Sequence, residues 1–205
     1  IFGRTRFHGY VIERQSGDSK LNHIVESIRA RKNWSDETPY DKGRLRALKA
    51  LAKLPYTHGN RIKLLIDGQN TFADIFAGID AAQEYVLVQF FIVHDDAIGR
   101  ELKKRLIAKA QQDIKVFFLY DEIGSNKLPA AYLDELRAAH VQVSPFNSTR
   151  GALNRFQLNF RNHRKVVVVD GDIGWLGGHN VGDEYLGRDV KFGPWRDTHI
   201  RLEGP

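Results

Sequence analysis

Two side chains that can do phosphorus chemistry stand two residues apart in the last third of the chain, at His163 and Lys165. A neutral imidazole nitrogen is a competent nucleophile towards phosphorus, and a neighbouring ammonium group can neutralise the phosphate oxygens as charge develops. The apolar run 166–169 that follows predicts a buried strand, and side chains alternate faces along a strand. His163 and Lys165 are therefore expected on one face, where both can reach one phosphate.

A glycine pair and an asparagine follow a second short apolar run, 173–176. They stand in the order Gly177-Gly178-His179-Asn180. Glycines let the backbone approach an anion closely, so Gly177 and Gly178 are expected to bind substrate. The amide of Asn180 can donate to a phosphate oxygen. We interpret His179 as a packing or surface residue.

Three carboxylates accompany this pattern. Asp170 has the opposite parity to Lys165 along the strand, which favours a structural carboxylate for a turn or an ion pair over a direct catalytic role. A histidine nucleophile needs an orienting partner on its other nitrogen, and Asp197, at the start of the last strand, is the candidate, with a strand-end turn as the alternative. Asp121 follows another strand and is either at the rim of the site or an ordinary turn residue.

Written as a pattern, these residues read H-x-K-x4-D-x6-G-G-x-N. The pattern resembles the HKD signature of the phospholipase D superfamily, whose members cut and re-form phosphodiester bonds. The flanking segments 159–165, 181–187 and 195–199 are similar to those around the first HKD motif of bacterial cardiolipin synthases. The resemblance covers nearly the whole chain and is weakest over 13–55. One departure is Gly178, where many superfamily members have a serine.

The resemblance implies an activity: transfer of a phosphatidyl group from one phosphatidylglycerol to another, which gives cardiolipin and glycerol. It implies that His163 forms a phosphohistidine, that Lys165 and Asn180 bind the phosphate, and that Asp197 orients the histidine. Asp170 would be the third letter of the signature. No metal or other cofactor is implied.

A complete site of this family needs two HKD motifs, and this chain carries one. The resemblance implies that the second lies further on in the same polypeptide, although a second copy of the chain could also supply it. We expect the isolated chain to have little or no phosphatidyltransferase activity. Two alternatives are a homodimeric phosphodiesterase or nuclease with one motif per chain, and a non-catalytic half that binds anionic lipid or a partner.

Charge is distributed unevenly along the 205 residues. Residues 1–60 hold 12 Lys/Arg and 6 Asp/Glu, which accounts for the whole net charge of +6. Such a segment can bind anionic phospholipid at a membrane surface, or it can be a solvated charged face. Nucleic acid is not expected as a partner, because aromatic residues are not interleaved at stacking positions. The expected location is the bacterial cytoplasmic membrane.

Two compositional features bear on the origin of the chain. It begins with Ile1 and contains no methionine, so we expect it to be part of a longer protein. It also contains no cysteine, which excludes disulfides and thiolate metal sites.

Strand and helix patterns alternate from residue 61 onwards. Strands are expected at 61–66, 85–93, 114–120, 141–146 and 166–169, and helices at 71–82, 96–112 and 129–139. Smaller expectations are a turn at 67–68, a loop at 148–158 and an apolar helical stripe over 41–54. Two domains follow: a basic N-terminal segment, 1–55, after a presumed membrane anchor, and a phospholipase D-like domain, 56–205.

The alternation predicts an α/β fold of the phospholipase D-like layered type, with a mixed central sheet flanked by helices. His163 precedes its strand, whereas ligands of parallel sheets usually sit at carboxyl ends. We therefore expect 166–169 to run antiparallel to its neighbours, which would bring Asp121 to the same edge.

Overall fold

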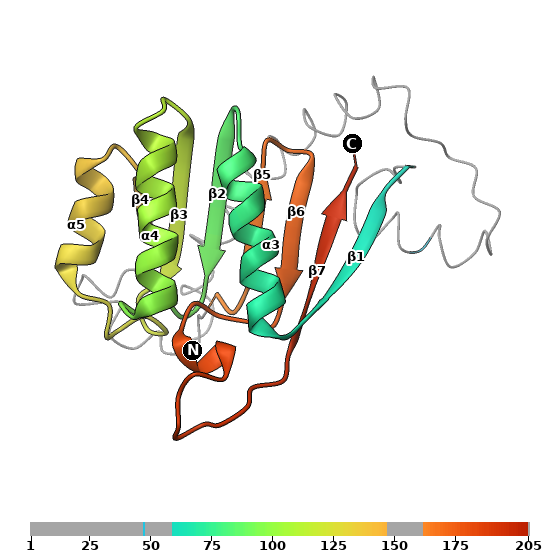
Figure 1. Cartoon of the computed structure of the whole chain (residues 1–205). Coiled ribbons are helices and arrows are strands. Elements are labelled where there is room, and N and C mark those ends of the chain that lie inside the picture. The colour runs from blue at the N-terminus through green and yellow to red at the C-terminus, as the bar shows by residue number, and fades with distance from the viewer. Residues whose placement is uncertain (1–46, 48–58, 147–161, 205) are drawn as a thin grey trace, which may run out of the picture. The chain divides into compact units, whose positions relative to one another are not determined.

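The computed structural model describes residues 47, 59–146 and 162–204 (Figure 1). The predicted segment 1–55 and the loop 148–158 lie outside the described residues, apart from residue 47. Arg61–Glu203 form one compact unit. Its strands are β1 (Arg61–Ile66), β2 (Tyr85–Phe90), β3 (Lys115–Asp121), β4 (Gln142–Phe146), β5 (Val166–Val169), β6 (Ile173–Gly177) and β7 (Thr198–Glu203). Its helices are α3 (Asp67–Ala81), α4 (Ala97–Ala110), α5 (Ala130–Ala138) and the short 3-10 helix η2 (Asp183–Leu186).

All seven strands form a single mixed sheet in the order β1-β7-β6-β5-β2-β3-β4. Strands β2, β3 and β4 are parallel, whereas β5 pairs antiparallel with both β2 and β6. The predicted antiparallel direction of β5 is therefore confirmed, and β5 is the central strand of the sheet. Its first residue lies at the edge where β2 and β3 end, which brings segments from distant parts of the sequence together.

The helices α3, α4 and α5 cover the same face of this sheet (Figure 1). The predicted helix over 71–82 is confirmed as part of α3, and its residues Phe72, Ile75 and Ile79 are all buried in the main core cluster. Leu102 and Leu106 of α4 join them there. Burial of such side chains stabilises the fold by roughly 1.5 to 3 kcal/mol each. None of the described helices is long and apolar enough to cross a membrane.

Two boundaries at the end of β1 and of β2 differ from the prediction. Asp67 adopts a left-handed conformation, with φ at 63°, and donates its amide to the carbonyl of Asp197. The chain thus reverses within one residue, and α3 begins where a longer turn was expected. Strand β2 ends at Phe90, and residues 91–93 leave it to form the edge of the site.

The start of α4 matches the sequence prediction. Asp96 is its N-cap and accepts a hydrogen bond from the amide of Gly99 at 3.0 Å. An aspartate at this position satisfies an otherwise unpaired amide of the first turn.

Candidate active site

His163 and Lys165 meet at the edge of the sheet where β5 begins. The ammonium nitrogen of Lys165 lies 2.9 Å from His163 Nδ1 and donates to the backbone carbonyl of His163 at 2.8 Å. Lys165 is only 3% exposed, whereas His163 is exposed. The structure therefore presents an imidazole at the surface with a buried cation directly beneath it, as the two-residue spacing predicts.

The contact between these side chains constrains the protonation of the histidine. An ammonium group can only donate, so a charged Lys165 leaves His163 Nδ1 as the acceptor and the ring proton on Nε2. Burial lowers the pKa of Lys165, while the negative charge of Asp197 partly offsets this effect. The lysine thus holds the histidine in one tautomer as long as no anion competes for the ammonium group.

Phe91 forms a wall of this site that the sequence did not identify. Its ring centroid lies 4.5 Å from that of His163, and Lys165 Nζ lies 5.5 Å from the same ring. The Ser125 hydroxyl fixes this segment, because it donates to the Phe91 carbonyl at 3.2 Å and accepts from the Val93 amide at 3.0 Å. The Phe91 ring is thus an apolar wall beside both the imidazole and the ammonium group.

Asp121 lies at the same edge and is almost fully buried. One carboxylate oxygen accepts from the amides of Ile123 and Gly124, both at 2.9 Å, and the other accepts from the amide of Asn162 at 2.9 Å. Both predicted roles are thus combined, since Asp121 closes its own turn and holds the backbone immediately before His163.

The two glycines serve a close approach between protein segments. A Cβ atom at Gly177 would collide with the His199 ring, and one at Gly178 would collide with the Asp197 carboxylate. The Gly178 amide donates to the Thr198 carbonyl at 3.0 Å and so is not available to an anion. The expected backbone contact with substrate is therefore not made through Gly178, whose role is to let Asp197 pack against β6.

Asp197 lies near three side chains that can carry positive charge. Its carboxylate accepts from the amide of Thr198 at 2.7 Å. Its charge raises the pKa values of Lys165, His179 and His199, in each case against the larger effect of burial. The structure thus places Asp197 close enough to act on the buried cation of the site.

A buried pair of histidines, His179 and His199, lies near Asp197. The Nδ1 atoms of His179 and His199 lie 3.1 Å apart, and the His179 amide also donates to His199 Nδ1 at 3.4 Å. His199 Nδ1 is therefore an acceptor, and the proton between the rings belongs to His179. Burial lowers the pKa of His199 to about 4, helped by His179 and Lys165, and burial also lowers the pKa of His179. The packing role predicted for His179 agrees with its full burial, whereas no role was predicted for His199.

Asn180 is also buried at this edge. Its side-chain oxygen accepts from the Ile92 amide at 3.0 Å, and its side chain also hydrogen-bonds the hydroxyl of Tyr185. The oxygen thus holds the segment after β2. Only the amino group of Asn180 can donate to a phosphate.

Asp170 lies at the opposite end of β5 from His163. Its carboxylate accepts three hydrogen bonds of 2.8 Å from the amides of Gln83, Glu84 and Tyr85. Burial raises the pKa of Asp170, but these amides outweigh burial and hold the pKa below its usual range. Asp170 therefore does not share the phosphate site: the structural interpretation agrees with its position, and the catalytic alternative does not.

Comparison with known proteins identifies the family to which this chain is similar. A family model described as "Cardiolipin synthase, PLD-like domain" matches residues 75–190. Over its whole length the chain is 46% identical to Cardiolipin synthase A of Pseudomonas putida (strain GB-1) and 47% identical to that of Pseudomonas entomophila (strain L48). It covers 44% of each, so the chain spans less than half the length of these relatives.

Among solved structures, NucT from Helicobacter pylori superposes with a TM-score of 0.52 at 17% identity, over 70% of this chain and 86% of that chain. This likeness concerns the fold alone, and the matching family model identifies the fold as the predicted phospholipase D-like one. With a matching family model over more than half of its residues, the chain belongs to the family of cardiolipin synthase phospholipase D-like domains.

Proposed function

We propose that the protein containing this chain is a phosphatidyltransferase that makes cardiolipin from two phosphatidylglycerol molecules. In this proposal the chain supplies one of two HKD motifs. The observation that carries it is the exposed imidazole of His163 above the buried ammonium group of Lys165. The identity to cardiolipin synthases over the whole chain supports the choice of substrate.

In the first step, a nitrogen of His163 attacks the phosphorus of the donor lipid. A bond between this nitrogen and phosphorus forms, and the bond from phosphorus to the glycerol headgroup oxygen breaks. The histidine of the second motif gives its proton to the leaving alkoxide, so glycerol departs. In the second step, a headgroup hydroxyl of another phosphatidylglycerol gives its proton to that second histidine and attacks the phosphorus. A bond between this oxygen and phosphorus forms, and the bond between phosphorus and the His163 nitrogen breaks, which releases cardiolipin and the free imidazole.

Lys165 couples substrate binding to the activation of His163. When a phosphate enters, its oxygens compete for the ammonium group that otherwise donates to His163 Nδ1. Once Nδ1 is released, the ring proton can move there, which leaves Nε2 with the free electron pair that attacks phosphorus. Asp197 then becomes the acceptor that holds the Nδ1 proton, the orienting role expected from the sequence.

Three partners complete the proposal. The basic segment 1–60 binds anionic phospholipid at the surface of the bacterial cytoplasmic membrane. A second HKD half, in the same polypeptide or from a second copy, supplies the other histidine, lysine and asparagine. In this proposal two further residues have positioning roles. Gly177 positions the His199 ring, and Asp121 positions the backbone before His163.

The test uses the full-length protein in mixed micelles of phosphatidylglycerol that carries a labelled phosphate. We expect cardiolipin and free glycerol in equal amounts, with label trapped on His163 after a rapid quench. His163→Asn should abolish both, while the exposed His140→Asn should leave both unchanged. Cleavage of DNA without turnover of the lipid would favour the single-motif nuclease. Lipid binding without phosphate exchange would favour the non-catalytic half.

A further inference from the structure

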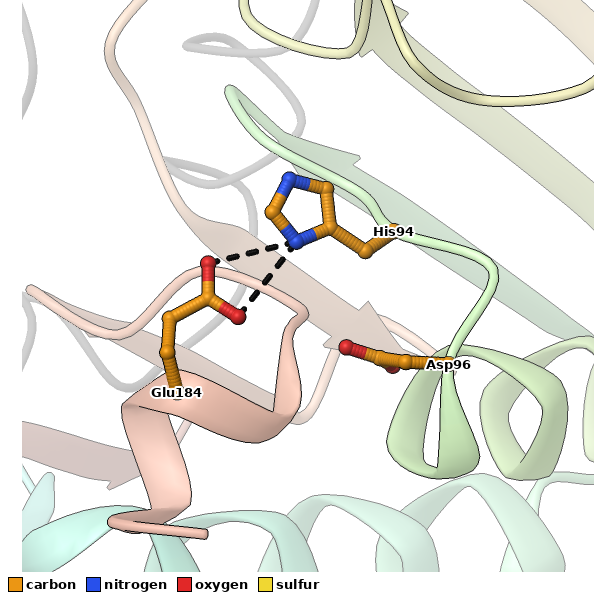
Figure 2. Close-up of side chains that lie close together, drawn as sticks. All are labelled: His94, Asp96 and Glu184. Atoms are coloured by element: carbon orange, nitrogen blue, oxygen red, sulfur yellow. Dashed lines mark hydrogen bonds and ion pairs between the residues drawn. The ribbon is translucent and has the colours of Figure 1, made fainter. Parts of the chain in front are cut away.

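A second cluster of ligand-type side chains lies beside the phosphate site. His94, Asp96 and Glu184 point toward one another from the end of β2, the cap of α4 and the helix η2 (Figure 2). His94 Nδ1 lies 3.2 Å and 3.4 Å from the two carboxylate oxygens of Glu184. One nitrogen or oxygen atom from each of the three residues lies within 4.8 Å of the others. All three side chains are half-buried, and none takes part in the proposed lipid chemistry.

Backbone amides hold the carboxylate of Asp96 in place. One of its oxygens accepts from Gly99 at 3.0 Å, and the other accepts from Asp183 at 2.6 Å. Each carboxylate oxygen keeps a second lone pair, so these contacts orient the group without using up its capacity as a ligand. Ligating carboxylates in metal sites are typically hydrogen-bonded in this way.

The backbone of His94 is fixed as well. Its amide donates to the carbonyl of Val181 at 3.0 Å, and Val93 forms a bridge with the same residue. The segment after β2 and the segment before η2 are therefore joined just where the three side chains meet. Such support reduces the conformational entropy that a ligand would have to overcome.

The surroundings supply both space and negative charge. A pocket of about 820 Å³ opens beside the cluster, large enough for water molecules around a bound ion. Five carboxylates line it against two basic side chains. The five are Asp95, Asp96, Asp183, Glu184 and Asp189, and the two are Lys127 and Arg188. One imidazole and several carboxylates around an open, polar cavity form an environment that favours a divalent cation.

We propose that His94, Asp96 and Glu184 bind one divalent cation of the Zn²⁺ type, with its open position towards the pocket. Zinc takes imidazole nitrogen and carboxylate oxygen at about 2.0 to 2.2 Å, with three protein ligands and a water molecule in open sites. Two tetrahedral ligands at such distances lie roughly 3.3 Å apart, close to the separation of His94 and Glu184. The three ligand atoms lie within 4.8 Å of one another, so they have to approach by about 1.5 Å at most.

A bound cation would stabilise the arrangement of the segments around His163. It ties the segment that carries Phe91, which contacts His163, to the segment that begins with Asn180. Both segments form walls of the phosphate site, so a bound ion would hold them at a fixed separation. This inference does not depend on the identity of the lipid substrate.

The experiment measures Zn²⁺ binding to the full-length protein by titration calorimetry in a buffer without chelators. We expect one saturable site whose dissociation constant rises at least 50-fold in both His94→Gln and Glu184→Gln. Asp134→Asn, which removes an exposed carboxylate of α5, serves as the matched control and should bind as the wild type does. Zn²⁺ should also raise the unfolding temperature of the wild type and of this control, and not that of the two ligand variants.

Two results would overturn the proposal. One is the absence of saturable binding to the wild type, and the other is equal binding by all the variants. If the ligand variants do not fold, diffraction from zinc-soaked wild-type crystals at the zinc absorption edge decides the question. An anomalous peak between His94 and Glu184 supports the site, whereas a peak at any other place rejects it.

Discussion

Residues of the HKD signature flank strand β5 at both ends, and the two groups of residues have different functions. At its first end, Lys165 places a buried cation beneath the exposed imidazole of His163. At its last end, Asp170 binds three backbone amides that belong to the start of β2. The first end leaves charges available for a ligand, whereas the second end satisfies its charge within the protein.

This difference teaches that the letters of one motif need not form one site. A four-residue strand spans roughly 13 Å, so residues that flank it cannot contact the same phosphate. The lysine and histidine have the proposed catalytic roles, whereas the aspartate binds the backbone at the start of β2. Substitutions at the two ends should therefore separate loss of activity from loss of stability.

Lys165→Met should give the largest effect. In the proposed mechanism the ammonium group beneath His163 stabilises the transferring phosphate, so we expect its removal to reduce turnover by the full-length protein about 10³-fold. The free energy of unfolding should stay level or rise, because a buried charge is replaced by an apolar side chain of similar size. The readout is cardiolipin formation alongside urea unfolding. Lys115→Met is the control and should keep full activity, because Lys115 is an exposed residue at the start of β3, the opposite end of that strand from Asp121.

Asp197→Asn should reduce turnover by about 10²-fold, less than the loss of the lysine, since the cation beneath His163 remains. Asp197 raises the pKa of Lys165, so its neutralisation should lower that pKa further. Activity that needs the protonated lysine should then be lost at a lower pH than in the wild type. A pH profile of turnover measures this shift. An unchanged alkaline limb, or the same shift in the exposed Asp172→Asn, would contradict the assignment.

Much of the structure at the start of β5, around His163 and Lys165, could be predicted from the sequence. The apolar run 166–169 and the parity of His163 and Lys165 are local features, and a strand pattern fixes them. The antiparallel direction of β5 followed from one geometric requirement, that a site at the start of this strand must meet the carboxyl ends of β2 and β3. The N-cap at Asp96 is equally local, since the capping contact spans only three residues.

The surroundings of the site could not be predicted in the same way. Gly178 looks like a residue for anion binding, but whether it faces a phosphate or a carboxylate depends on β7, which pairs with β6 from more than twenty residues further on. The pairing of His179 with His199 depends on the same register. Asp67-Gly68 looks like a turn, and only the contact of Asp67 with Asp197 shows why a helix starts there.

Asp170→Asn should change stability and leave turnover nearly intact. The asparagine tolerates the left-handed backbone at this position, where φ is 54°, but it offers a single neutral oxygen to three amides. We expect the free energy of unfolding to fall by roughly 2 to 3 kcal/mol, in line with hydrogen bonds to a charged group. Asp113→Asn is the matched control, an exposed aspartate with φ at 63°. Loss of turnover in a folded Asp170→Asn protein would place this carboxylate in the chemistry after all.

The smallest effect is a pH dependence of stability between pH 7 and pH 5, which arises at the first end of β5. Burial lowers the pKa of His199 to about 4 in the folded protein, compared with about 6.5 in the unfolded chain. A lowered pKa means that the unfolded state binds the proton more readily, so stability is complete above about pH 6.5 and declines as the pH falls towards 4. Between pH 7 and pH 5 the free energy of unfolding should drop by at most about 2 kcal/mol through this residue. Urea unfolding across this range should show a shallower decline in His199→Gln than in the wild type, and an unchanged decline in His140→Asn. Equal slopes in all three proteins would mean that His199 is solvated and that the histidine pair does not support the phosphate site.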